Sequence, residues 1–199
     1  PELARSIRED EERCDHYEDI IGTYLVQLSS HSLSDSESQE STELLKTIGD
    51  FERISDHAVN VLESAEELQS KGLSFSPAAM AEYETLARAI REILHLSLDS
   101  FRQNDAARAA RVEPLEQVID KLKEEMRTRH ILRMRQGQCS IEAGFVWADL
   151  LTDLERTSDH CSNIAGCVIE TLRAAQTQDP DFAGRFRDYA QTYRLPEGE

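Results

Sequence analysis

Residues 50–60 read DFERISDHAVN, and residues 153–163 repeat this stretch as DLERTSDHCSN. Adding 103 to a position in the first copy gives its counterpart in the second, and seven polar residues recur in this way. They are Asp50, Glu52, Arg53, Ser55, Asp56, His57 and Asn60, matched by Asp153, Glu155, Arg156, Ser158, Asp159, His160 and Asn163. A helix repeated only for packing would preserve its apolar spacing and let its polar residues drift. The repeat therefore predicts one scaffold used twice for a shared chemical role.

Apolar residues keep a spacing of three or four over most of the chain, which is typical of helices, and no segment alternates as a strand does. We expect helices over residues 2–31, 39–71, 77–101, 114–136, 140–176 and 180–195, with a short helical piece at 105–112. Ser36 and Gln39 are expected to form a capping box at the second helix, and Gly72 to end it. Pro114 should kink or restart the fourth helix, and Ser140 should cap the fifth.

The repeat also suggests how the helices are grouped. The first helices carry a second repeated motif, because Glu11-x-x-x-Asp15 corresponds to Glu116-x-x-x-Asp120 at an offset of 105. We therefore predict an all-α fold with six helices in two repeated three-helix bundles. Residues 1–199 would form a single domain, with residues 1–103 as the first repeat and residues 104–199 as the second.

Composition narrows the classes of partner. The chain has 39 acidic and 22 basic residues among 199 and a net charge of −17, which repels phosphate backbones and argues against nucleic acid. The four cysteines show no C-x-x-C spacing, so we expect reduced thiols in a cytosolic setting. No apolar run approaches the roughly 18 residues of a membrane-spanning helix. Because the chain starts at Pro1, close to or inside a helix, we expect a fragment, with a membrane portion upstream left open.

The repeated carboxylates predict a cation site. Glu and Asp four positions apart share one helix face, and two antiparallel helices that each present such a pair would bring four carboxylates together. Arg53 and Arg156 could neutralise them in part, which is the alternative of a purely structural ion pair. A single arginine is a poor match for four carboxylates, whereas a divalent or trivalent metal neutralises them well. The predicted ligands are Glu11, Asp15, Glu52, Asp56, Glu116, Asp120, Glu155 and Asp159.

Oxygen ligands favour iron, manganese or magnesium, and a nearby histidine would admit zinc. His57 and His160 follow the aspartates directly and point about 100° away from them, so we expect them to support the ligands or to make hydrogen bonds between helices. The same second group includes Asn60, Asn163, Asp50 and Asp153.

Enzyme signatures are scarce. A ferritin-like di-iron enzyme would need two Glu-x-x-His pairs, and only Glu92 and His95 fit this spacing, without a repeat counterpart. The chain also has no glycine-rich phosphate loop, nucleophile elbow or zinc-protease motif. The sequence therefore predicts a protein that is not an enzyme.

With its acidic Glu-x-x-x-Asp motifs in two repeats, the chain resembles the PhoU family over nearly its whole length. Residues 47–57 (TIGDFERISDH) and 149–165 (DLLTDLERTSDHCSNIA) look like the cytoplasmic PhoU-like domain at the C-terminal end of bacterial sodium/phosphate cotransporters. The resemblance implies a regulatory role in phosphate homeostasis and, as in some members, multinuclear iron or other metals on the acidic motifs. It also implies a partner, the membrane domain of a phosphate transporter in the same or another chain, at the cytoplasmic face of the membrane.

Two hypotheses follow. In the first, the chain is a metal-binding regulatory module of a sodium-dependent phosphate transporter. In the second, it is a stand-alone regulator of phosphate uptake that acts as a metal-free helical interaction domain. Long helical bundles are also compatible with a homodimer.

Overall fold

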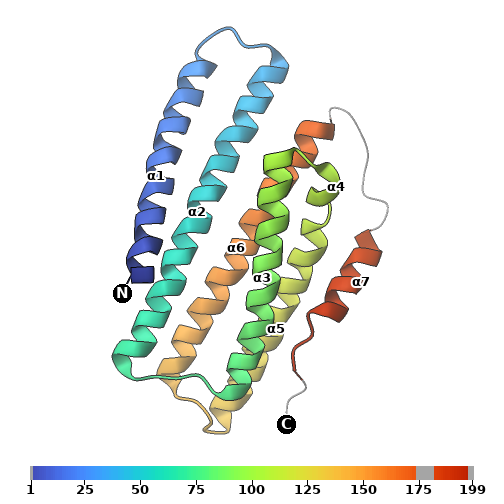
Figure 1. The fold of residues 1–199 in the computed structure, drawn as a ribbon. Helices are drawn as coiled ribbons and strands as arrows, with labels where there is room; N and C mark the ends of the chain where they lie inside the picture. The colour runs from blue at the N-terminus through green and yellow to red at the C-terminus, as the bar shows by residue number, and fades with distance from the viewer. Residues whose placement is uncertain (1, 174–181, 197–199) are drawn as a thin grey trace.

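The chain folds into helices, as its apolar spacing predicts. The computed structural model describes residues 2–173 and 182–196, which contain helices and no strand (Figure 1). The all-α prediction is confirmed. Within the described part, no helix is both long enough and apolar enough to cross a membrane. The helices are α1 (Glu2–Ser29), α2 (Asp35–Lys71), α3 (Pro77–Gln103), α4 (Ala106–Ala109), α5 (Val112–Arg135), α6 (Ile141–Arg173) and α7 (Phe182–Thr192).

Most helix ends follow the predicted signals. Gly72 ends α2 in the left-handed conformation at φ 62°, and the Ser140 hydroxyl accepts a hydrogen bond from the Ala143 amide at the start of α6. The capping box predicted at Ser36 is wrong. Ser34 forms it with Glu37, because Ser34 is the last extended residue and α2 starts at Asp35, four positions before the expected residue 39.

Pro114 restarts the fourth helix, since it lies in the first turn of α5, where its missing amide is no loss. The expected helix end near residue 176 and the start at residue 180 lie outside the described residues.

The predicted boundary at residue 103 places α3 with α1 and α2, but in the structure α3 packs against α5 and α6. The reason is the distribution of apolar residues. Leu86 and Ile93 of α3 are fully buried, together with Ile119 of α5 and Trp147 of α6, whereas α1 buries only Leu25 in full. We therefore define unit one as α1 and α2, and unit two as α3, α5 and α6.

Unit one is a two-helix hairpin that touches the rest of the molecule through α2 (Figure 1). The Arg8 guanidinium pairs with the Glu66 carboxylate between its helices at 2.7 Å. The outer side of α1 stays open, with Tyr17 and Tyr24 each about 60% exposed. The apolar spacing predicted α1 correctly, but a helix with a single packing partner buries only part of its stripe.

The contact between α2 and α6 joins the two units (Figure 1). Asp153 of α6 is its first anchor. One of its carboxylate oxygens lies 2.9 Å from Nδ1 of His57 and accepts a hydrogen bond of 3.1 Å from the Asn60 amide, both on α2. These are residues from opposite copies of the sequence repeat.

The second anchor is the same arrangement with the helices exchanged. Asp50 of α2 lies 2.8 Å from Nδ1 of His160 and accepts a hydrogen bond of 3.0 Å from Asn163, both on α6. Between the anchors the His57 and His160 rings stack with centroids 5.6 Å apart. The hydrogen bonds across the α2–α6 contact thus have an approximate twofold symmetry, as in an isologous dimer interface.

We predict that Asp153→Ala lowers the free energy of unfolding by roughly 1–2 kcal/mol, because it leaves the partly buried His57 ring and the exposed Asn60 amide without their charged acceptor. Chemical denaturation measures the change. Asp149→Ala, at an exposed aspartate one turn earlier on α6, is the matched control and should change stability by less than about 0.5 kcal/mol. Equal effects of the two substitutions would contradict this role for Asp153.

Candidate functional site

The four carboxylates predicted for the second repeat come together between α5 and α6. Glu116 shows this best, since burial and then the charges of Glu113, Asp120, Asp159 and Glu155 raise its pKa to about 7. The pKa values of Asp120 and Asp159 are also raised, first by burial and next by Glu155. We call Glu116, Asp120, Glu155 and Asp159 acidic face two. Its members repel one another, which makes it attractive to cations.

Acidic face two already contains a cation that the motif did not reveal. Nζ of Lys123 lies 2.7 Å from Oε1 of Glu155, and both side chains are less than 20% exposed. The same ammonium group lowers the pKa of Asp120 and so opposes part of the effect of burial. One lysine is therefore matched against four carboxylates.

The corresponding face in unit one has a different composition. Burial, then the charge and hydrogen bond of Asp56 and then the charge of Glu18 raise the pKa of Glu52, while the Arg53 charge opposes them. We call Glu18, Glu52 and Asp56 acidic face one. Glu18 was not predicted as a site residue. The offset of 105 that relates Asp15 to Asp120 makes Glu18 the equivalent of Lys123. Unit one thus has a carboxylate where unit two has an ammonium group.

The predicted ligands Glu11 and Asp15 lie on α1, up to two turns before Glu18. Asp15 is exposed, and no hydrogen bond or ion pair joins either residue to Glu52 or Asp56 within the described part of the chain. The four carboxylates of unit one are therefore less closely gathered than those of unit two.

The six other candidate site residues lie at the contact between α2 and α6 and not on the acidic faces. Asp50, Asp153, His57, His160, Asn60 and Asn163 are the anchors of the α2–α6 contact described above. The expectation that the histidines make hydrogen bonds between helices is thus confirmed. Across the described residues, no three histidine, cysteine or acidic side chains are close enough to hold a metal ion as they stand.

Two further repeated residues have local roles. The hydroxyls of Ser55 and Ser158 donate to the backbone carbonyls of Glu52 and Glu155. Glu92, from the single Glu-x-x-His pair, accepts a short hydrogen bond from the Tyr193 hydroxyl and so serves the C-terminal segment. Most of the repeated polar residues therefore have a structural explanation, and Glu52, Asp56 and Asp159 are the acidic ones without an ion pair among the described residues.

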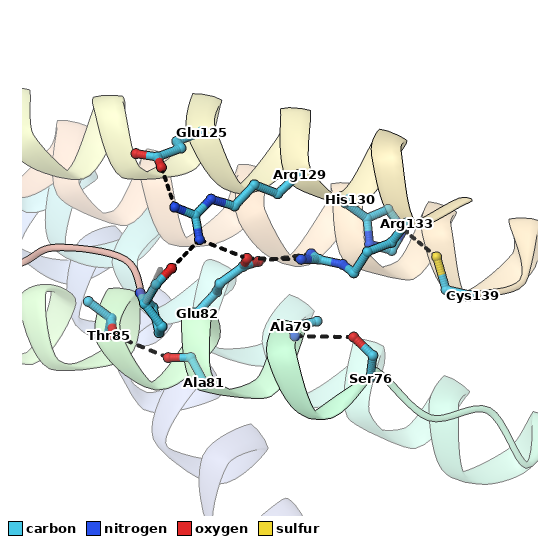
Figure 2. A network of polar contacts seen from close by, with 11 residues as sticks. Ser76, Ala79, Ala81, Glu82, Thr85, Glu125, Arg129, His130, Arg133 and Cys139 are labelled. Carbon is cyan, nitrogen blue, oxygen red and sulfur yellow. Dashed lines mark hydrogen bonds and ion pairs between the residues drawn. The ribbon is translucent and has the colours of Figure 1, made fainter. Parts of the chain in front are cut away.

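Sequence analysis missed a buried ionic network at the other end of unit two (Figure 2). Glu82 of α3 is 2% exposed and receives both terminal nitrogens of Arg133, at 2.9 and 2.8 Å. Arg129 approaches the same carboxylate at 3.5 Å. Because only burial distinguishes this glutamate from the many solvated ones, no local pattern could have revealed it.

The model of the PhoU domain family matches residues 1–65 and 83–168, which is more than half of the chain. The chain belongs to the PhoU domain family. The two matched segments correspond to unit one and to most of unit two, with α3 falling in the second.

PhoU proteins are also its relatives in sequence and structure. It is 28% identical to "Phosphate-specific transport system accessory protein PhoU homolog 1" of Thermotoga maritima, over 63% of this chain and 53% of that protein. A homolog from Pseudomonas putida is 27% identical over 88% of this chain and 68% of that one. The crystal structure of PhoU from Pseudomonas aeruginosa matches with a TM-score of 0.80 at 25% identity, covering 87% of this chain and 82% of the other. The chain thus spans about half to two thirds of these curated PhoU sequences.

We predict that the metal-free protein loses stability as pH rises from 5 to 8. Folded Glu116 keeps its proton to about pH 7, while the unfolded chain releases it near 4.5, so the folded state binds more protons in this window. Glu116→Gln cannot titrate and should gain roughly 1–2 kcal/mol relative to the parent between pH 5 and pH 8, after allowance for solvent screening.

Urea denaturation at several pH values, with a chelator present, measures this difference. Glu84→Gln, at an exposed position of α3, is the control and should keep the parent pH dependence. If Glu116→Gln also followed the parent profile, Glu116 would not be a protonated group of the folded state.

Proposed function

We propose that this chain is an accessory regulator of phosphate transport that acts by binding other proteins and catalyses nothing. The observation that carries the proposal is the match to the PhoU family across both units. The relatives reported above bear the name of accessory proteins of phosphate-specific transport, which fits a regulatory role.

The proposed partner is a phosphate transporter at the cytoplasmic face of the membrane. Between the two hypotheses from the sequence, the names of these relatives favour an accessory protein over the C-terminal domain of a sodium/phosphate cotransporter. The two differ in a measurable way, since a cotransporter domain would act only on sodium-driven uptake.

We predict that cells lacking this protein no longer adjust phosphate uptake to external phosphate, and that the intact gene restores the response with sodium or with choline in the medium. Uptake of radiolabelled phosphate measures both. A response restored only in sodium would favour the cotransporter, and an unchanged response in the deleted strain would contradict the regulatory role. Asp153→Ala and Asp149→Ala serve as a destabilised variant and its control.

We also propose that the acidic faces bind hard cations. The chemistry of the donors fits, because burial and then neighbouring carboxylates raise the pKa values of Glu52, Glu116 and Asp159, and a bound cation would offset both effects. Bound iron, manganese or magnesium would supply positive charge and join α5 to α6 through acidic face two. On acidic face one it would join α1 to α2 through Glu18 and Glu52.

Lys123 makes the two faces unequal, because its ammonium group occupies the position in which a cation would contact Glu155. We therefore predict that acidic face one binds manganese more tightly, and that Lys123→Ala raises the affinity of acidic face two by about tenfold or more. Lys71→Ala removes a similar glutamate-paired lysine from the end of α2 and should change neither face.

Titration calorimetry with manganese, followed by elemental analysis, tests this. The face-specific variants are Glu52→Gln with Asp56→Asn and Glu155→Gln with Asp159→Asn. Background metal in the parent and in Lys123→Ala would leave the acidic faces as surfaces for proteins alone, which is the metal-free interaction domain of the second hypothesis.

A further inference from the structure

A cavity of about 400 Å³ opens between α5 and α6, close to the loop that joins them. This volume is in the range of small-molecule sites. Met134 and Leu151 line it, and at its mouth Ile141 and Phe145 are 71% and 68% exposed. Large apolar side chains this exposed are unfavourable in water, so the mouth is a surface that an apolar group would cover.

Two residues that line the cavity each have one buried nitrogen without a hydrogen-bond partner. Nε1 of Trp147 and Nδ1 of His130 are buried and make no hydrogen bond within the described part of the chain. Trp147 is 1% exposed and His130 is 4% exposed, with their rings stacked at 5.6 Å. Buried polar groups normally have a partner, and one left unsatisfied suggests a missing acceptor or donor.

Both nitrogens are donors when the Cys139 thiol donates to His130. The indole nitrogen can only donate. Nε2 of His130 lies 3.7 Å from the Cys139 sulfur (Figure 2), and a thiol that donates to Nε2 leaves the ring hydrogen on Nδ1. Burial and then the charge of Arg133 hold the pKa of His130 below its usual range, which keeps the imidazole neutral. Both nitrogens have almost no accessible surface, so they lie behind the cavity wall, and the charge of the residues that line the cavity decides which ligand it favours.

The charges around the cavity have one sign. None of the described residues that line it is acidic, although 39 of the 199 residues in the chain are. Lys123 and Arg127 line it instead. Lys123 is already paired with Glu155, whereas Arg127 is exposed and has no ion-pair or hydrogen-bond partner among the described residues.

We propose that this cavity binds a small amphiphilic anion, with its apolar body against Met134 and Phe145 and its acidic head near Arg127. Carboxylate, phosphate or sulfonate heads would all pair with the free guanidinium group. A neutral apolar molecule would leave this group unpaired, and a cation would be repelled by Arg127. The proposal is independent of the phosphate-transport role and of metal on the acidic faces.

Trp147 is the single tryptophan of the chain, so its fluorescence reports directly on the cavity. The probe is decanoate below its micelle concentration, with decanol as the neutral molecule of equal chain length and acetate as the anion without an apolar body. We expect a saturable change in emission with decanoate, and binding at least about tenfold weaker for decanol and acetate. Titration calorimetry gives the stoichiometry, which should be one.

Two pairs of variants locate the site. Arg127→Gln should weaken decanoate binding about tenfold, while Arg91→Gln, which removes the same charge from an exposed position of α3, should bind as the parent does. Ala148→Leu puts a larger side chain at an exposed position of the cavity wall and should abolish binding, while Ala65→Leu at an exposed position of α2 should not. Thermal unfolding of each variant confirms that it is folded.

Equal binding of decanol and decanoate, or equal losses in Arg127→Gln and Arg91→Gln, would overturn the proposal. Vesicles distinguish the source of the anion. Sedimentation with vesicles rich in anionic lipid, without saturable binding of free decanoate, would assign the surface to a membrane and would also overturn it. These outcomes leave the phosphate-uptake experiment untouched, so the two proposals fail separately.

Discussion

The contact between α2 and α6 holds the two units together, and two aspartates, Asp50 and Asp153, anchor it. Each of them takes its donors from the opposite unit, through one histidine and one asparagine. At 100° per residue, Asp50 and His57 share one side of α2, whereas Glu52 and Asp56 lie on the opposite side. The bonds that orient α2 toward α6 therefore also turn Glu52 and Asp56 away from it, in the direction of Glu18 on α1. The same arithmetic applies to α6.

Repetition of a fold does not imply repetition of a charge. Glu18 and Lys123 occupy equivalent positions of the repeat. Acidic face one therefore carries three carboxylates, while acidic face two balances four carboxylates with one ammonium group. Burial and neighbouring carboxylates raise the pKa values of Glu52 and Glu116, so keeping these groups ionised in the folded state costs stability. Such a cost is typical of functional sites. The unpaired buried nitrogens of Trp147 and His130 are a second case in the same unit.

Much of the structure was predictable from the sequence where the signal is local. Apolar spacing predicted the helices, and Gly72 and Ser140 marked their ends. The internal repeat predicted that Glu116 and Glu155 would meet. The grouping of helices failed at α3, because the repeat identifies equivalent helices but not which neighbours they choose; that choice depends on buried residues such as Ile93. Lys123 and Glu82 were missed since an ion pair between helices has no sequence pattern.

The distance along the chain between the partners of each anchor also bears on how the protein folds. The hairpins α1–α2 and α5–α6 close over short loops, whereas the hydrogen bonds between α2 and α6 join residues 93 to 113 positions apart. Closing a longer loop costs more chain entropy, and distant contacts slow folding. The hairpins should thus form early and the stacked His57 and His160 rings late. Until then both aspartates remain in water, so assembly of the two units is the step that decides whether the chain has finished folding.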